Sequence, residues 1–197
     1  MAAPEPGPGE LVLAVEACGL CGTDLMKLAT KPATAVLGHE ICGRVARVGA
    51  GVTAFREGDR VAAAHHVPCG DCHYCRRGSV SMCRQFKATN VDPGGFAEYV
   101  RLSPLHARHA TFKVPDGVEP AAASQMEPLA CVLRNAKRVR AREVDVIGIV
   151  GLGAIGQLTA RLLARVFKAQ VVGLDLDEER AAALEGYGRG FTSWEAF

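Results

Sequence analysis

Four cysteines stand close together in the middle of the chain. Cys69, Cys72, Cys75 and Cys83 lie within fifteen residues, and four thiolates on short loops are the ligand set of a closed, structural zinc site. The alternatives are two disulfides in a secreted protein, or four unrelated thiols. Because the start Met1-Ala-Ala-Pro-Glu5 lacks the basic and apolar regions of a secretory signal, we expect a zinc site. A closed site leaves no coordination position for a substrate.

A second group of possible metal ligands and neighbours lies nearer the N-terminus. Its members are Cys18, Cys21, Thr23, Asp24, His39 and Glu40. Thiolate, imidazole and carboxylate groups bind zinc, and further carboxylates and hydroxyls commonly surround such a site. However, Cys18 and Cys21 form a lone CxxC, which a redox motif or half a zinc site could share. An isolated His-Glu pair is usually incidental, so the residues alone leave a second metal site open.

Five further histidines have no spacing that suggests metal binding. They are His65, His66, His73, His106 and His109. We interpret each of them as a surface or packing residue rather than a ligand.

The C-terminal third has the pattern of a nucleotide-binding βαβ unit. Val144–Val150 predicts a buried strand that runs directly into the turn Gly151-Leu-Gly-Ala-Ile-Gly156. Residues 157–168 then predict a helix, and Val171–Leu174 predicts a second strand that ends at Asp175. Strand, glycine turn, helix, strand and acid in this order are typical of dinucleotide binding.

This unit also indicates the cofactor. We expect the cofactor to contact Gly151, Gly153, Ala154, Ile155, Gly156 and Asp175. Backbone N–H groups at the helix start bind its phosphates, and the Asp175 carboxylate accepts hydrogen bonds from the adenosine ribose. A carboxylate at this place repels a 2′-phosphate. Since acidic residues also surround Arg180, the sequence favours NAD over NADP.

Composition and pattern define the overall class. The 197 residues are 49% hydrophobic and 22% charged, with a net charge of +2. This is typical of a soluble globular protein and does not suggest a nucleic-acid or membrane partner. Eight cysteines without a secretory signal indicate a reducing compartment, and we expect a cytoplasmic location.

The fold class predicted is mixed α/β, in two domains. Residues 1–115 have short apolar runs between glycine turns, as in an irregular, mostly β domain. The pattern changes after Pro115, and residues 116–197 begin a doubly wound nucleotide domain. Residues 121–138 predict a helix that Glu127-Pro128 interrupts.

Taken together, these motifs resemble the zinc-dependent medium-chain dehydrogenases, which include alcohol, sorbitol and threonine dehydrogenases. The resemblance covers almost the whole chain. Besides the four cysteines and the glycine turn with Asp175, it rests on Cys21-Gly-Thr-Asp24, Gly38-His-Glu-x-x-Gly43, Gly58-Asp-Arg-Val61, Gly94-Gly-Phe-Ala-Glu-Tyr-Val100 and Glu127-Pro-Leu-Ala130.

The resemblance implies a GroES-like catalytic domain followed by a Rossmann NAD-binding domain. It implies two zinc ions, one structural and one catalytic. Cys21 and His39 would be ligands of the catalytic ion, and Glu127 stands where the family has its third protein ligand. Glu40 is an adjacent carboxylate that can also bind the metal, so the choice between Glu40 and Glu127 stays open.

The family mechanism is hydride transfer between an alcohol, polyol or amino-alcohol and NAD. The zinc ion lowers the pKa of the substrate hydroxyl. By resemblance, Thr23 passes the alcohol proton outward, and Asp24 orients His39 by accepting its second ring N–H. Met26 stands where many relatives carry a histidine that continues this relay. A homo-oligomer is possible, since relatives pair through the nucleotide domain.

The chain also departs from the family pattern at its end. It stops at Phe197, after the second strand of the nucleotide fold, and Gly186–Phe197 lacks a clear third-strand pattern. We therefore expect an incomplete nucleotide domain and a chain that is weak or inactive alone. The alternative function is a non-catalytic zinc-binding fragment with residual nucleotide affinity. A zinc-free quinone reductase of the same superfamily is disfavoured, because it would need neither the catalytic zinc ligands nor the four-cysteine lobe.

Overall fold

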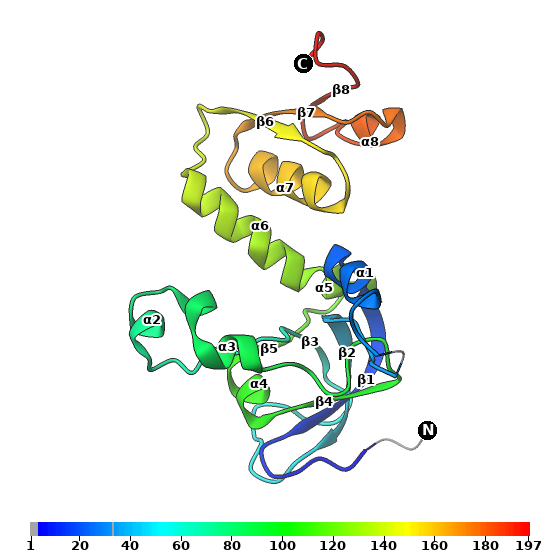
Figure 1. The fold of residues 1–197 in the computed structure, drawn as a ribbon, viewed down its shortest axis with the longest axis vertical. Coiled ribbons are helices and arrows are strands. Elements are labelled where there is room, and N and C mark those ends of the chain that lie inside the picture. Colours follow the sequence, from blue (N-terminus) through cyan, green and yellow to red (C-terminus); the bar gives the residue numbers. More distant parts are fainter. Residues whose placement is uncertain (1–3, 33) are drawn as a thin grey trace. The chain divides into compact units, whose positions relative to one another are not determined.

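The computed structural model describes residues 4–32 and 34–197, in two compact units, Met1–Glu127 and Pro128–Phe197 (Figure 1). The first three residues of the predicted N-terminal domain lie outside the described part. Both units are built from strands and helices, which confirms the mixed α/β class. The predicted boundary at residue 115 falls inside the first unit, because helix α5 (Pro120–Ser124) packs against β1 and β2 of that unit. None of the described helices has the length and apolar character needed to cross a membrane.

The first unit is organised around a five-stranded antiparallel sheet with the strand order β4-β1-β2-β3-β5. Its strands are β1 (Leu11–Gly19), β2 (Glu40–Val48), β3 (Arg60–Ala63), β4 (Tyr99–Leu102) and β5 (Thr111–Lys113). Strands β1 and β2 are the longest and form its centre, where Gly19 pairs with Glu40 at one end. This end of the β1–β2 pair carries the residues of the candidate metal centre.

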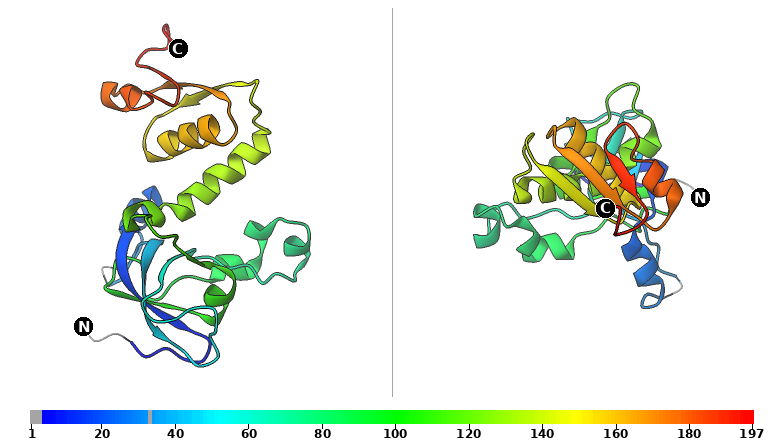
Figure 2. Two further views of the ribbon diagram at one scale, coloured as in Figure 1. Left: turned by 180° about the vertical axis from the view of Figure 1, so that it is seen from behind. Right: turned by 90° about the horizontal axis from the view of Figure 1, so that it is seen from above.

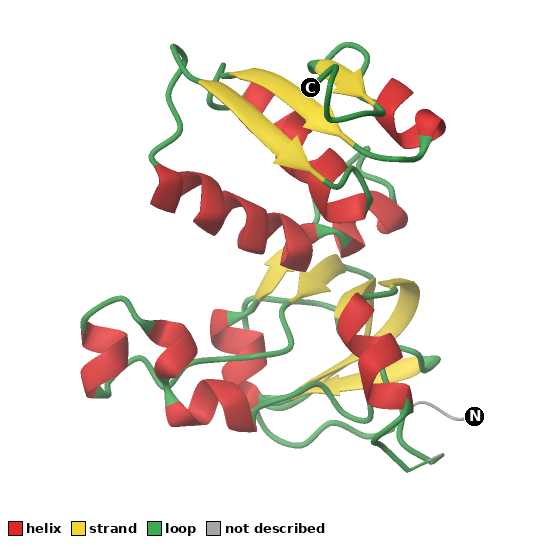
Figure 3. Cartoon of the chain, turned by 45° about the horizontal axis from the view of Figure 1, so that its top comes forward, coloured by secondary structure: helices red, strands yellow, loops and turns green. Residues whose placement is uncertain are grey.

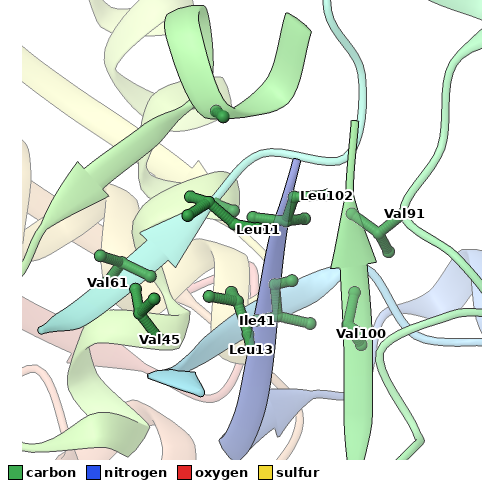
Figure 4. Close-up of a cluster of buried hydrophobic side chains, with 10 residues drawn as sticks. Leu11, Leu13, Ile41, Val45, Val61, Val91, Val100 and Leu102 are labelled. Carbon is green, nitrogen blue, oxygen red and sulfur yellow. The ribbon is translucent and has the colours of Figure 1, made fainter. Parts of the chain in front are cut away.

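Branched apolar side chains from four of these strands form the core of the first unit. Figure 4 shows Leu11 and Leu13 of β1 lying against side chains of the neighbouring strands. The other labelled members are Ile41, Val45, Val61, Val91, Val100 and Leu102, and each is at most 3% exposed. Because side chains alternate across a strand, Leu11 and Leu13 share one face. This packing fixes the sheet that holds the metal ligands.

Short helices connect the strands of the first unit. They are α1 (Gly22–Leu28), α2 (His73–Arg76), η1 (Val80–Met82), α3 (Arg84–Ala88) and α4 (Pro104–His109). Helix α1 follows β1 directly, whereas α2, η1 and α3 belong to the four-cysteine lobe between β3 and β4 (Figure 1).

The helix predicted over residues 121–138 is two helices. Helix α5 ends at Ser124, Gln125 is its C-cap residue, and α6 (Met126–Val139) begins directly after Gln125. Pro128 lies in the first turn of α6, where the N–H that proline lacks would have no intrahelical partner. The proline therefore marks a helix start, and Glu127 lies in that same first turn.

The second unit contains the βαβ unit that the sequence predicts. Its elements are β6 (Val146–Val150), α7 (Ala154–Arg165), β7 (Gln170–Leu174), α8 (Glu178–Ala182) and β8 (Arg189–Phe191). The three strands form a parallel sheet in the order β6-β7-β8. Figure 2 shows them side by side in yellow, orange and red, and Figure 3 shows their common direction. The chain therefore adopts the first part of a doubly wound fold.

Two expectations for this unit were wrong. The C-terminal tail does contain a third strand, because β8 pairs with β7 through Arg189, Gly190 and Phe191. Gly190 allows this, since a Cβ there would overlap the carbonyl oxygen of Ala181. Strand β6 is not fully buried: it is at the edge of the sheet, and Val146 and Val150 on one face are more than 60% exposed.

Truncating Leu13 tests the role of the β1–β2 core. Because Leu13 is completely buried, Leu13→Ala leaves a cavity, and we expect it to lower the free energy of unfolding by about 2–5 kcal/mol. Hydrogen exchange of the β1 and β2 backbone amides measures this loss. The matched control is Leu20→Ala, since Leu20 is 66% exposed. Equal exchange rates in the two variants would contradict the assignment of this core.

Candidate functional site

The four cysteines of the lobe converge on one point. The Sγ atoms of Cys69, Cys72, Cys75 and Cys83 all lie within 4.8 Å of one another. Cys72 is 3.5 Å from Cys75, Cys83 is 3.6 Å from Cys69, and Cys69 is 3.9 Å from Cys75. All four are free thiols rather than disulfides.

These separations fit a tetrahedral zinc ion. A Zn–S bond of about 2.3 Å implies that tetrahedral sulfur ligands lie about 3.8 Å apart. The pKa values of the four thiols are not equal. Backbone N–H groups of Cys69 and Phe86 lower the pKa of Cys83 to about 6, whereas desolvation raises the pKa of Cys75 to about 12. A bound cation would hold all four as thiolates.

A second group of ligand atoms converges at the end of the β1–β2 pair. One ligand atom each from Cys21, His39 and Glu40 lies within 4.8 Å of the others. Cys21 is the residue before α1, and Glu40 is the first residue of β2. His39 and Glu40 are each 6% exposed. The structure thus brings together three ligand types from two segments that are separate in the sequence.

The buried carboxylate of Asp24 holds these two segments together. Its Oδ2 accepts a hydrogen bond from the Cys21 N–H (3.1 Å). Its Oδ1 accepts one from the Gly38 N–H (3.2 Å) and lies 3.3 Å from Nδ1 of His39. With Nδ1 directed at Asp24, Nε2 of His39 is free for a metal ion.

Glu127 and His65 lie beside this group. Glu127 is not within 4.8 Å of all three ligand atoms, but its Oε1 is 4.0 Å from Nδ1 of His65. The His65 ring packs against His39, with ring centroids 4.5 Å apart. Nδ1 of His65 is buried and has no hydrogen-bond partner in the described part of the chain. A buried nitrogen without a hydrogen-bond partner, next to a carboxylate, is a donor set that fits a metal centre.

Burial controls the charge of both residues. It raises the pKa of Glu127, an effect that His39 opposes and Glu40 reinforces. Burial also lowers the pKa of His65 to about 3, with smaller contributions from His66, His39 and Lys27. His65 is therefore neutral near pH 7.

The sequence did not identify His65 and His66 as part of this neighbourhood. Their rings are 3.9 Å apart, and His66 also lines the cavity next to His39. The signal that could have found them is their position just before Cys69, between β3 and the lobe. His106, in contrast, is a packing residue, since its two ring nitrogens contact Ser103 and the carbonyl of His65.

The remaining predicted residues of the first unit have varied environments. Thr23 is in the first turn of α1 and is exposed, as is Met26. Cys42 is fully buried in the core, and burial raises the pKa of Cys18 to about 11. Cys131 is exposed.

The glycine turn of the second unit has the predicted shape. Gly151 has a φ of +90°, a left-handed conformation that glycine adopts without strain. Gly153 directly precedes α7, and nothing lies within 4 Å of the place where its Cβ would be. A Cβ on Gly156 would overlap the Gly151 carbonyl oxygen. Ala154 and Ile155 begin α7, where the first backbone N–H groups of a helix have no intrahelical acceptor, next to the open space at Gly153.

Asp175 lies at the end of β7, next to this turn. Its Oδ2 accepts a hydrogen bond from the Leu152 N–H (2.7 Å), and its Oδ1 accepts one from the Asp177 N–H (3.0 Å). These two bonds, with a smaller contribution from Arg180, lower the pKa of Asp175. Nη1 of Arg180 is 3.9 Å from Oδ2 of the same carboxylate.

Comparison with known proteins identifies the family. Residues 7–116 match the alcohol dehydrogenase GroES-like domain. The chain belongs to the zinc-dependent medium-chain dehydrogenases. An L-threonine 3-dehydrogenase from Deinococcus deserti is 35% identical over 185 residues, which are 90% of this chain and 52% of that protein. The chain thus spans about half the length of the curated relatives it matches.

Solved structures of other dehydrogenases and reductases share this fold. An acetophenone reductase from Geotrichum candidum in complex with NAD has 33% identity and a TM-score of 0.83, over 97% of this chain and 58% of its own. A galactitol-1-phosphate dehydrogenase from Escherichia coli has 28% identity and a TM-score of 0.81, over 96% and 55%. These matches confirm the predicted fold class of this member of the family.

The hydrogen bonds to Asp175 predict a pH effect on the nucleotide turn. Because its pKa is lowered in the folded chain, the stability it contributes is present above its ordinary pKa of 3.8 and is lost as pH falls through the lowered value. We expect the Leu152 and Asp177 amide NMR shifts to titrate together with a midpoint below 3.8. Asp175→Asn should abolish this titration, and a midpoint at or above 3.8 would contradict the geometry.

Proposed function

We propose that the chain forms part of a zinc- and NAD-dependent dehydrogenase. The enzyme transfers a hydride between NAD and an alcohol, polyol or amino-alcohol. The observation that carries this proposal is the convergence of Cys21, His39 and Glu40, three zinc ligand types within 4.8 Å. The family match and the similarity to alcohol-oxidising relatives support the same reaction class.

In this proposal Cys21, His39 and Glu40 bind the catalytic zinc ion, and Glu127 is the adjacent carboxylate. When bound, the ion supplies Lewis-acid polarisation of the substrate oxygen. Asp24 holds the His39 ring through Nδ1, so that Nε2 faces the centre. The Thr23 hydroxyl, exposed on the first turn of α1, passes the substrate proton outward. Burial lowers the pKa of His65, so its neutral ring adds no positive charge beside the centre.

We assign the four-cysteine lobe a structural zinc ion. Cys69, Cys72, Cys75 and Cys83 use four thiolates for one tetrahedral ion, which leaves no position for a substrate. The lobe has little other means of holding its shape, since α2, η1 and α3 are each five residues or shorter. Metal binding therefore stabilises a segment that could not fold by helix formation alone.

We assign NAD to the glycine turn of the second unit. Gly151, Gly153, Ala154, Ile155 and Gly156 would surround the pyrophosphate, where glycine conformation and helix N–H groups favour an anion. The Asp175 carboxylate would accept hydrogen bonds from the ribose hydroxyls. Its lowered pKa keeps it negatively charged, which disfavours the 2′-phosphate of NADP.

Two further properties follow from this proposal. None of the eight cysteines forms a disulfide, and thiolate zinc sites persist where thiols stay reduced, so we place the protein in the cytoplasm. The resemblance to relatives that pair through the nucleotide domain supports a homo-oligomer.

Zinc stoichiometry tests the two metal sites. We expect the zinc-loaded chain to retain two ions after removal of free metal, measured by elemental analysis. Cys75→Ser should lose the lobe ion, and Cys21→Ser the second ion, because each removes one thiolate ligand. Cys131→Ser is the control, since Cys131 is exposed and outside both clusters, and it should retain two ions. Two ions in the Cys21→Ser variant would refute the proposed catalytic centre.

The two carboxylates can be separated by substitution. If Glu40 is the ligand and Glu127 its neighbour, Glu40→Gln should weaken the second zinc ion more than Glu127→Gln does. Each substitution should lower the zinc affinity by on the order of 10-fold or more, since both the ligands and the groups that surround them determine metal affinity. Competition with a chromophoric chelator measures both affinities. The reverse order would make Glu127 the third ligand.

Activity separates this proposal from the alternative. NADH formation from a secondary alcohol that is lost in Cys21→Ser but kept in Cys131→Ser supports the dehydrogenase. One tightly held zinc ion without NADH formation supports a non-catalytic zinc-binding fragment with residual nucleotide affinity.

A further inference from the structure

A cavity of about 520 Å³ lies next to His39, and most of its charged lining is positive. Lys27, Lys31 and Lys87 line it together with His66 and Asp24. We propose that this cavity binds an anionic group, phosphate or carboxylate, of the substrate. The inference rests on the proposed function, because it places the reacting hydroxyl near His39 and the anion near the lysines.

Asp24, the one acidic residue in this lining, cannot neutralise the lysines. Its carboxylate already accepts hydrogen bonds from the Cys21 and Gly38 N–H groups and faces the His39 ring. It is only 2% exposed. Its charge is therefore directed into the first unit, away from the open space of the cavity.

The three lysines have no carboxylate partners of their own. Lys113 forms a 2.8 Å ion pair with Asp59, but none of Lys27, Lys31 and Lys87 pairs with a carboxylate in residues 4–32 and 34–197. Lys27 and Lys31 are four positions apart, and Lys87 comes from α3, far away in the sequence. Three like charges around one cavity repel each other, and a bound anion relieves that repulsion.

The remaining polar lining suits the same ligand class. The side-chain oxygen of Asn90 already accepts a hydrogen bond from the Val91 N–H, so its amide group retains its N–H donors. A cavity of this volume fits a metabolite rather than a macromolecule. A neutral alcohol would use none of these cations, so hydroxy acids and polyol phosphates are the favoured substrates.

Matched pairs of probes test the inference by binding, without turnover. Glycerol 3-phosphate is compared with glycerol, and 3-hydroxybutyrate with butan-2-ol, by titrating amide NMR shifts of the zinc-loaded chain. We expect at least one anionic member to bind about tenfold more tightly than its neutral partner, with shifts around Lys27 and Lys87. Added salt should reduce this advantage.

Charge removal provides the matched control. Lys27→Gln, Lys31→Gln and Lys87→Gln, combined and singly, should remove the anion advantage. Because Lys31 and Lys87 are exposed and Lys27 is half-buried, we expect the variants to retain the fold. Lys137→Gln removes the same charge from exposed α6 and should have no effect.

The outcomes distinguish a phosphate ligand from a carboxylate ligand, and the cavity proposal from the dehydrogenase proposal. If the anionic member binds more tightly in only one of the two probe pairs, that pair identifies the preferred anion as phosphate or carboxylate. Equal binding within both pairs, or an advantage that survives the triple variant, overturns the inference even if neutral alcohols are oxidised. Lysine-dependent anion binding in a chain without a Cys21-dependent zinc ion would support the cavity and refute the proposed dehydrogenase centre.

Discussion

The buried carboxylate of Asp24 is the constraint on which the candidate centre depends. It links the start of α1, where Cys21 lies, to the segment that carries Gly38 and His39. Without an acceptor there, the part-buried Cys21 N–H and the buried Gly38 N–H would lose their partner. The β1–β2 pair adds a second link, because Gly19 pairs with Glu40 and a Cβ at Gly19 would overlap the Glu40 carboxylate. The ligands are therefore held before any ion binds.

This arrangement explains the unusual polarity of the site. The sheet core ends in apolar residues such as Ile41, and a thiol, an imidazole and two carboxylates follow directly at its edge. Burial raises the pKa of Glu127, which favours its neutral form, and lowers the pKa of His65, which keeps the ring neutral. Burial therefore reduces the number of charged groups in this region. Burying ligands without their ion costs free energy, which the packed β1–β2 core offsets. A divalent cation would compensate the negative charges of both carboxylates, Glu40 and Glu127, of which Glu127 also lies beside Nδ1 of His65.

Features with local sequence signals were predictable, and features made by long-range contacts were not. The cysteine spacing and the strand–glycine–helix–strand order each lie within one short stretch, and the structure has the corresponding elements. The approach of His65 to Glu127 joins residues far apart in the chain, for which no periodicity exists. Strand β8 was missed because its stability comes from pairing with β7 and from glycines at close contacts, not from strand-forming side chains. The exposure of β6 depends on which neighbours cover it, and its apolar sequence cannot report that.

The division of the chain into two units separates metal binding from nucleotide binding. Cys21, His39, Glu40 and Glu127 all belong to the first unit, and the core that holds them is complete within it. The glycine turn and Asp175 belong to the second unit, which has its own core around Leu152, Leu163 and Leu184. The residues proposed for metal binding and those proposed for nucleotide binding therefore each lie in a unit with its own core. The hydride transfer that we propose would require both, because the metal centre would orient the alcohol and the nucleotide would accept the hydride.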